Sequence, residues 1–231
     1  MLSIKAVIFD LDGTLADSVR DIADTMNALL QERGRPGFGT DEFRQWIGGG
    51  SAAMVRRIAD LRQITDGEAF LATYLLRYGE NVALRTRLYD GVGDMLQSCI
   101  ERRLPMALLS NKDEAMVMRL HRALFAKDVF DEVLGVSTAF PKKPDPQSSL
   151  HIARRLNASP EECLFVGDTR IDMATARAAG MRFAAALWGY GSSQELMAAR
   201  PDFSFASPTD FASFIRAQVS ARRDALPATV S

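Results

Sequence analysis

Short apolar runs and longer amphipathic stretches alternate through most of the chain. The apolar runs have the length of strands buried on both faces, and they lie at 106–109, 133–136, 164–166, 182–187 and 203–205. Between them, apolar residues recur at helical spacing in the segments 92–103, 113–125, 147–156, 171–179, 193–198 and 209–219. Strands that alternate with helices in this way predict a parallel, doubly wound α/β sheet.

The N-terminal part of the chain breaks this alternation. Residues 6–9 predict one more buried strand, but four helical patterns then follow with no strand between them. They cover 18–34, a stretch that begins after Thr40, 51–62 and 66–78, and we expect Ser18 and Thr40 to be N-caps. Such an insertion predicts an all-helical cap domain. We expect an α/β core of residues 1–16 and 88–220, a cap of 17–87, and a C-terminal tail of 221–231 that frays.

Composition and charge narrow the possible partners and location. The 231 residues are 47% hydrophobic and 25% charged, with a net charge of -1, so we expect a globular protein that does not bind nucleic acid. Every apolar stretch is shorter than the roughly 20 residues that span a bilayer. Without a signal-peptide pattern, a cytoplasmic location is expected, with Cys99 and Cys163 as free thiols. A monomer and a homodimer both remain open.

Two carboxylates follow the first predicted strand directly. Asp10 and Asp12 are spaced i, i+2 and are followed by Gly13 and Thr14. Their side chains would leave the carboxyl end of the strand on the same side, at the edge where open α/β sheets bind ligands. Two acidic groups this close repel unless a cation or a shared proton compensates them, and Mg²⁺ prefers oxygen ligands. A turn rich in Asp and Gly is the simpler alternative.

Three further segments carry polar residues at or near strand ends. Ser110 and Asn111 close one strand, Lys143 lies in a proline-flanked loop, and Asp168 and Asp172 lie at a strand-to-helix junction. The i, i+4 spacing of the two acids would put both carboxylates on one face of the helix start. Each motif has a simpler explanation, such as an N-cap or an acid that complements the helix dipole. Four such motifs in order favour one shared site.

These motifs resemble those of the haloacid dehalogenase-like hydrolases. The resemblance rests on Asp-x-Asp-Gly-Thr at 10–14, a strand ending in Ser110-Asn111, Lys-Pro-x-Pro at 143–146 and Gly-Asp-x-x-x-Asp at 167–172. It implies that Asp10 is the nucleophile and Asp12 the general acid and base. It further implies that the phosphoryl group is held by Ser110, Asn111, Lys143 and the backbone at Gly13 and Thr14. Mg²⁺ would be held by Asp10, the Asp12 backbone carbonyl and Asp168, with Asp172 acting directly or through water.

The cap resembles that of phosphoglycolate phosphatases. The similarity includes Asp17-Ser18, Trp46-Ile47-Gly48-x-Gly50 and Met54-Val55-x-Arg57, and it implies that Gly49, Gly50 and Arg57 help to bind the substrate. Residues 17–83 contain no lysine, which disfavours relatives that use a cap lysine, either for a Schiff base or as a phosphoglucomutase does. An arginine fork would suit a carboxylate in the leaving group.

The resemblance therefore implies a Mg²⁺-dependent phosphomonoester hydrolase that acts through an aspartyl-phosphate on a small phosphorylated metabolite. 2-Phosphoglycolate is the favoured substrate. A sugar phosphate, a nucleotide and pyrophosphate remain alternatives. A non-catalytic binding or regulatory protein of the same fold is the alternative of another class, and the presence of every motif residue disfavours it.

Overall fold

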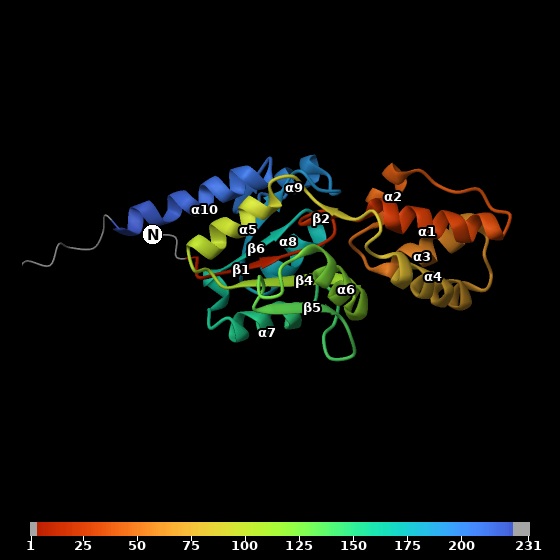
Figure 1. Ribbon diagram of the computed structural model, residues 1–231, viewed down its shortest axis with the longest axis horizontal. Helices are drawn as coiled ribbons and strands as arrows, with labels where there is room; N and C mark the ends of the chain where they lie inside the picture. The colour runs from red at the N-terminus through yellow and green to blue at the C-terminus, as the bar shows by residue number, and fades with distance from the viewer. Residues whose placement is uncertain (1–3, 224–231) are drawn as a thin grey trace, which may run out of the picture.

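A six-stranded parallel sheet forms the centre of the computed structural model, which describes residues 4–223 (Figure 1). The strand order is β5-β4-β1-β6-β7-β8. The strands are β1 (Ala6–Phe9), β4 (Met106–Asp113), β5 (Glu132–Val136), β6 (Cys163–Gly167), β7 (Arg182–Ala186) and β8 (Phe203–Phe205). Because the chain first adds strands on one side of β1 and then on the other, β1 lies at the switch point of the sheet, where ligands bind in such folds. The predicted fold class is confirmed.

Helices cover both faces of the sheet. Val7 and Phe9 of β1 pack in the core with α5 (Val92–Glu101), α6 (Glu114–Leu124) and α10 (Pro208–Arg223), and Figure 1 shows α5 and α10 side by side. Ala6 and Ile8 pack on the opposite face against α7 (Gln147–Arg155), α8 (Arg170–Ala178) and α9 (Ser193–Ala198). Both faces of β1 are therefore buried, and this explains its unbroken apolar sequence.

Four helices form a second body beside the carboxyl ends of the central strands (Figure 1). They are α1 (Val19–Glu32), α2 (Thr40–Trp46), α3 (Ser51–Arg62) and α4 (Gly67–Asn81). A two-stranded antiparallel ribbon of β2 (Ala16–Asp17) and β3 (Arg87–Leu88) connects them to the sheet. The sequence did not predict this ribbon, because two residues are too few to show a periodicity of two.

Several predicted boundaries were wrong. Gly39, not Thr40, is the N-cap of α2. Ser18 is the N-cap residue of α1, as expected, but its side chain forms no capping hydrogen bond. Strand β4 runs four residues further than predicted, to Asp113. Helix α10 continues to Arg223, past the expected end of the core at 220, and residues 224–231 of the expected tail lie outside the described residues. A short 3₁₀ helix, η1 (Pro160–Glu162), was also missed.

Two further expectations concern the thiols and the membrane. Cys99 and Cys163 are free and buried, as predicted, and burial raises the pKa of the Cys99 thiol to about 12 and that of Cys163 to about 11. Among the helices of residues 4–223, none combines the length and hydropathy that crossing a membrane requires.

Candidate active site

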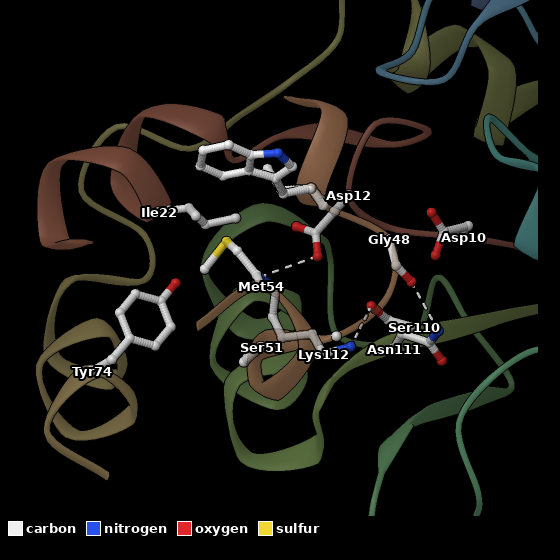
Figure 2. Close-up of a pocket in the computed structure, with 13 residues that line it drawn as sticks. Asp10, Asp12, Ile22, Gly48, Ser51, Met54, Tyr74, Ser110, Asn111 and Lys112 are labelled. Atoms are coloured by element: carbon white, nitrogen blue, oxygen red, sulfur yellow. Dashed lines mark hydrogen bonds and ion pairs between the residues drawn. The ribbon is translucent and has the colours of Figure 1, made fainter. Parts of the chain in front are cut away.

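A small cavity lies between the carboxyl ends of β1 and β4 and the four-helix body (Figure 2). The enclosed space measures about 30 Å³. The helical side supplies mostly apolar walls, namely Ile22, Trp46, Ile47, Met54 and Tyr74, together with Gly48, Gly50 and Ser51. The sheet side supplies only polar side chains, namely Asp10, Asp12, Ser110, Asn111 and Lys112.

Asp10 belongs to a buried group of three carboxylates. Oxygen atoms of Asp10, Asp168 and Asp172 all lie within 4.8 Å of one another. Strand pairing explains this proximity, because Phe9 lies beside Val166 and the residues after these strands emerge at the same edge. The Lys143 ammonium lies between two of the acids, at 2.5 Å from Asp10 Oδ1 and 2.6 Å from Asp172 Oδ1. The structure thus brings together residues from three of the four sequence motifs.

Burial and mutual repulsion shift the pKa values of this group. Burial raises the pKa of Asp10 well above its usual range, although Lys143 opposes the effect. Burial and the charge of Asp172 raise the pKa of Asp168 to about 7. Burial would lower the pKa of Lys143, but the charges of Asp10 and Asp172 outweigh it and raise that pKa. One lysine thus serves three carboxylates, and these oxygen donors suit a hard divalent cation.

Glycine-containing loops allow close packing around Asp168. Its side chain accepts hydrogen bonds from Thr14 Oγ1 at 3.1 Å and from the backbone N–H groups of Tyr190 at 2.7 Å and Gly191 at 3.2 Å. Gly13 has φ +91°, and a Cβ there would lie 2.3 Å from Asp168 Oδ2. A Cβ on Gly191 would lie 1.8 Å from the Asp168 carbonyl oxygen. Both positions therefore require glycine. Gly13 and Thr14 contact Asp168 but do not line the cavity.

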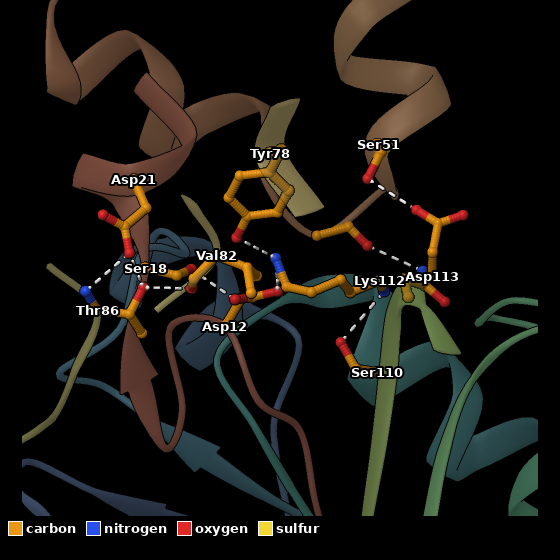
Figure 3. Close-up of polar contacts among 12 residues, drawn as sticks. Asp12, Ser18, Asp21, Ser51, Tyr78, Val82, Thr86, Ser110, Lys112 and Asp113 are labelled. Atoms are coloured by element: carbon orange, nitrogen blue, oxygen red, sulfur yellow. Dashed lines mark hydrogen bonds and ion pairs between the residues drawn. The ribbon is translucent and has the colours of Figure 1, made fainter. Parts of the chain in front are cut away.

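Asp12 has different partners (Figure 3). Its Oδ1 accepts a hydrogen bond from Ser18 Oγ at 2.5 Å, and its Oδ2 lies 3.1 Å from Lys112 Nζ. Lys112 also donates a hydrogen bond to Tyr78 Oη of α4 at 2.8 Å. Because the Asp12 carboxylate is directed to Ser18 and Lys112, a metal contact from this residue would use its backbone carbonyl. The cavity therefore contains two carboxylates, each with its own buried lysine.

Ser110 and Asn111 lie on the extension of β4 that the sequence did not predict. Ser110 is buried and accepts a hydrogen bond from the Lys112 N–H at 3.2 Å. The Asn111 amide donates to the carbonyls of Gly48 at 2.8 Å and Lys143 at 3.0 Å, and its oxygen accepts from the Lys143 N–H at 2.6 Å. Both amide hydrogens are committed, so Asn111 here holds the Lys143 loop and the cap loop together. Its contact with a phosphoryl group stays a prediction.

The residues expected in the cap divide into two sets. Gly50 lines the cavity together with Gly48. Gly49 and Arg57 instead border an outer hollow on the far side of Trp46, and the Arg57 guanidinium lies 5.6 Å from the centre of the Trp46 ring. The structure therefore does not bring Gly49 or Arg57 into the cavity.

Sequence reasoning gave no role to Lys112, Tyr78 or Tyr190. The signal for Lys112 is its position two residues after Ser110, which places both side chains on the same face of an extended strand. Tyr190 lies in the loop after β7, where its N–H contacts Asp168 and its hydroxyl contacts Asp17 at 2.8 Å. A sequence pattern does not show such contacts, because the partners are far apart along the chain.

Comparisons with known proteins agree with this arrangement. Residues 7–186 match the family model of haloacid dehalogenase-like hydrolases. The chain is 37% identical over 203 residues to phosphoglycolate phosphatase 1 of Pseudomonas aeruginosa, covering 85% of this chain and 74% of that protein. It is 32% identical over 207 residues to the phosphoglycolate phosphatase of Aquifex aeolicus, covering 90% and 94%. A crystal structure described as a predicted phosphoglycolate phosphatase from Haemophilus somnus matches with a TM-score of 0.86 and 27% identity, covering 94% and 99%.

Proposed function

This chain belongs to the haloacid dehalogenase-like hydrolase family and is a phosphatase, and from this premise we propose that it hydrolyses 2-phosphoglycolate through an aspartyl-phosphate on Asp10. The observation that carries the proposal is the pair of buried carboxylates in one cavity with separate lysine partners, Lys143 for Asp10 and Lys112 for Asp12. Different surroundings are what two carboxylates need in order to act as nucleophile and as acid–base catalyst.

Asp10, Asp168 and Asp172 fit a magnesium ion. Their oxygens are close together and buried, and Lys143 pairs with two of the three carboxylates, those of Asp10 and Asp172. We propose that Asp10, Asp168 and the Asp12 backbone carbonyl hold Mg²⁺, with Asp172 contacting it through water and holding Lys143 and Thr169 in position. When bound, the ion would offset the charge of these acids and of the phosphoryl oxygens.

The reaction would have two steps. A carboxylate oxygen of Asp10 attacks phosphorus, and the bond from phosphorus to the ester oxygen breaks as Asp12 gives that oxygen a proton. Asp12 then takes a proton from a water molecule, whose oxygen attacks the phosphorus of the aspartyl-phosphate and releases inorganic phosphate. Lys143 and Ser110 would hold the phosphoryl oxygens, and Asn111 would keep the Lys143 loop in position.

The size and walls of the cavity favour a small leaving group. The cavity volume is only about 30 Å³, so little room is left beyond the phosphoryl group and a short leaving group. The relatives from Pseudomonas aeruginosa and Aquifex aeolicus are phosphoglycolate phosphatases. We propose that residues 17–87 act as a cap over the site, with the β2–β3 ribbon as the connection, and that the cap excludes bulk water during turnover.

Phosphate release across a panel of substrates tests this function. The panel contains 2-phosphoglycolate, a hexose phosphate, a nucleoside monophosphate and pyrophosphate, each with and without Mg²⁺. We expect kcat/KM for 2-phosphoglycolate to exceed the others by about 100-fold, or ~2.7 kcal/mol. Equal activity on all four compounds would overturn 2-phosphoglycolate as the proposed substrate. No phosphate release from any compound, with folded protein and Mg²⁺ present, would favour a non-catalytic binding protein of the same fold.

Asp10→Asn is the control for the nucleophile. We expect kcat to fall by at least about 10³-fold, while the melting temperature stays the same or rises because one charge leaves the buried acidic group. Phosphate release within about tenfold of the unchanged protein would show that Asp10 is not the nucleophile.

A further inference from the structure

Lys112 is a buried cation in the part of the cavity where the leaving group would lie. Its side chain is 4% exposed, yet it lines the cavity together with the apolar residues Ile22 and Met54 of the helical body (Figure 2). It is the one lysine or arginine that lines this cavity among the described residues. Burying an ammonium costs free energy unless nearby groups compensate it, so its position calls for a reason.

The hydrogen bonds of Lys112 leave one donor uncommitted. An ammonium has three N–H donors. Within residues 4–223, its polar side-chain partners are the Asp12 carboxylate at 3.1 Å and the Tyr78 hydroxyl at 2.8 Å. A further donor is therefore free to meet a group that enters the cavity.

We propose that Lys112 binds the carboxylate of the leaving group and thereby selects 2-phosphoglycolate over uncharged phosphomonoesters; this inference rests on the proposed function. Lys112 Nζ lies 3.1 Å from Asp12, the residue proposed to protonate the ester oxygen. In 2-phosphoglycolate a single methylene group separates that oxygen from the carboxylate. An ester oxygen beside Asp12 therefore brings the carboxylate within reach of Lys112.

The surroundings add to the effect of this charge. Helix α3 begins at the cavity with Gly50 as N-cap and Ser51 as its first residue, and its first turn contains no acidic residue. The positive end of its dipole thus lies on the same side as Lys112, although the Asp113 carboxylate, which accepts a hydrogen bond from Ser51 Oγ at 3.2 Å, offsets part of it. Because the cap walls are apolar, an ion pair formed here is weakened less by water than one on the surface.

Tyr78 fixes the ammonium from the cap side. Its ring is fully buried, with its centre 4.6 Å from Lys112 Nζ. The cap therefore contributes to substrate choice through a core lysine, although residues 17–83 contain none. This arrangement assigns to Lys112 the role that the sequence alone suggested for an arginine of the cap.

The test compares two substrates of similar size in Lys112→Met. The first is 2-phosphoglycolate, and the second is 2-hydroxyethyl phosphate, in which a hydroxymethyl group replaces the carboxylate. We expect the ratio of their kcat/KM values to fall by about 10- to 100-fold in the variant, as for the loss of a charge-assisted hydrogen bond. Lys112→Arg should restore part of the ratio. Lys127→Met, at an exposed lysine outside the cavity lining, is the matched control and should leave the ratio unchanged.

Each outcome assigns the failure to one proposal. If the unchanged protein prefers 2-phosphoglycolate and Lys112→Met lowers both kcat/KM values equally, Lys112 only positions Asp12 and this inference is overturned. If the unchanged protein shows no preference for 2-phosphoglycolate, the proposed substrate fails and the inference fails with it. A ratio is insensitive to the fraction of folded variant, and the Lys112→Arg arm covers the case in which Lys112→Met does not fold.

Discussion

Six charged side chains are buried within one small region of this molecule. Within residues 4–223, Asp10, Asp12, Asp168 and Asp172 share two cations, Lys112 and Lys143, and each of the six is at most 8% exposed. Fully ionised, they leave an excess of two negative charges that bulk water cannot solvate. Because burial penalises unpaired charge, either a proton or a cation must offset it. The pKa of Asp168 is raised for this reason: burial and the nearby charge of Asp172 both favour its protonated form when no cation is bound.

The pH dependence of metal binding tests this imbalance. Burial raises the pKa of Asp168 to about 7 in the folded protein, from its ordinary value of 3.8, so without a cation the folded state keeps a proton that the unfolded state releases. The stability of the metal-free protein should therefore fall as the pH rises from about 4 to about 7. Because Mg²⁺ binds the ionised acids, we expect it to raise the melting temperature by several degrees at pH 7.5 and by much less at pH 5.

Thermal unfolding in EDTA and in MgCl₂ at both pH values measures the effect. Asp168→Asn is the control, and it should lose most of the magnesium shift at pH 7.5. A shift that is equal at the two pH values, or larger at pH 5, would contradict the account.

One buried acid, Asp21, joins helix α1 to the segment 85–86 that leads from the helical body back to β3. Asp21 accepts hydrogen bonds from the N–H of Thr86 at 2.9 Å and the Thr86 hydroxyl at 2.7 Å (Figure 3). It also accepts one from the N–H of Arg85 at 2.9 Å. The two-residue strands β2 and β3 offer few hydrogen bonds of their own. The entry and exit of the cap are therefore joined by this contact as much as by the ribbon.

Replacing Asp21 tests the importance of that contact. Asp21→Ala leaves three donors without their acceptor, two of them on a buried threonine, so we expect the free energy of unfolding to fall by about 2–3 kcal/mol. The matched control is Asp24→Ala in the same helix. Its exposed ion pair with Arg85 should be worth less than about 1 kcal/mol. Equal losses in urea unfolding of the two variants would argue against a specific role for Asp21.

At the scale of the whole molecule, Tyr190 connects the acidic group to the cap. Its N–H donates to Asp168 at 2.7 Å. Its hydroxyl donates to Asp17 and accepts from the N–H groups of Ser18 at 2.8 Å and Val19 at 3.1 Å. Since a hydroxyl has one donor and two acceptor positions, all are used. Tyr190 thus provides the acceptor for the N–H groups at the start of α1. The Ser18 hydroxyl is therefore not needed as a cap and donates to Asp12 instead.

Tyr190→Phe should separate these two connections. The backbone contact with Asp168 remains, but the first turn of α1 loses its acceptor and Asp17 loses its donor. We expect kcat/KM to fall by about tenfold, because small displacements of the cap weaken substrate alignment, while the Mg²⁺ concentration for half-maximal activity changes little. Steady-state kinetics with varied substrate and varied Mg²⁺ distinguish the effects. A large change in Mg²⁺ dependence with unchanged kcat/KM would contradict this division of roles.

The sequence by itself determined the order of the elements and most of the catalytic motifs. The apolar run of β1, the strand and helix alternation after residue 91 and the four successive helices before it have local periodicities, and each predicted element is present in the structure. The acids at 10, 168 and 172 were predicted to share a site because four polar motifs follow in order at or near the ends of buried strands, where open α/β sheets bind ligands. Such inferences need only local pattern and general topology.

Only the tertiary structure decided how the site is completed. Lys112 meets Asp12 and Tyr78, Tyr190 meets Asp17 and Asp168, and Arg57 lies behind Trp46 and away from the cavity. These contacts join residues up to 173 positions apart in sequence, and they depend on where the cap rests on the sheet. That position results from packing over the whole interface, whereas periodicity reports only which side of its own helix or strand a residue occupies.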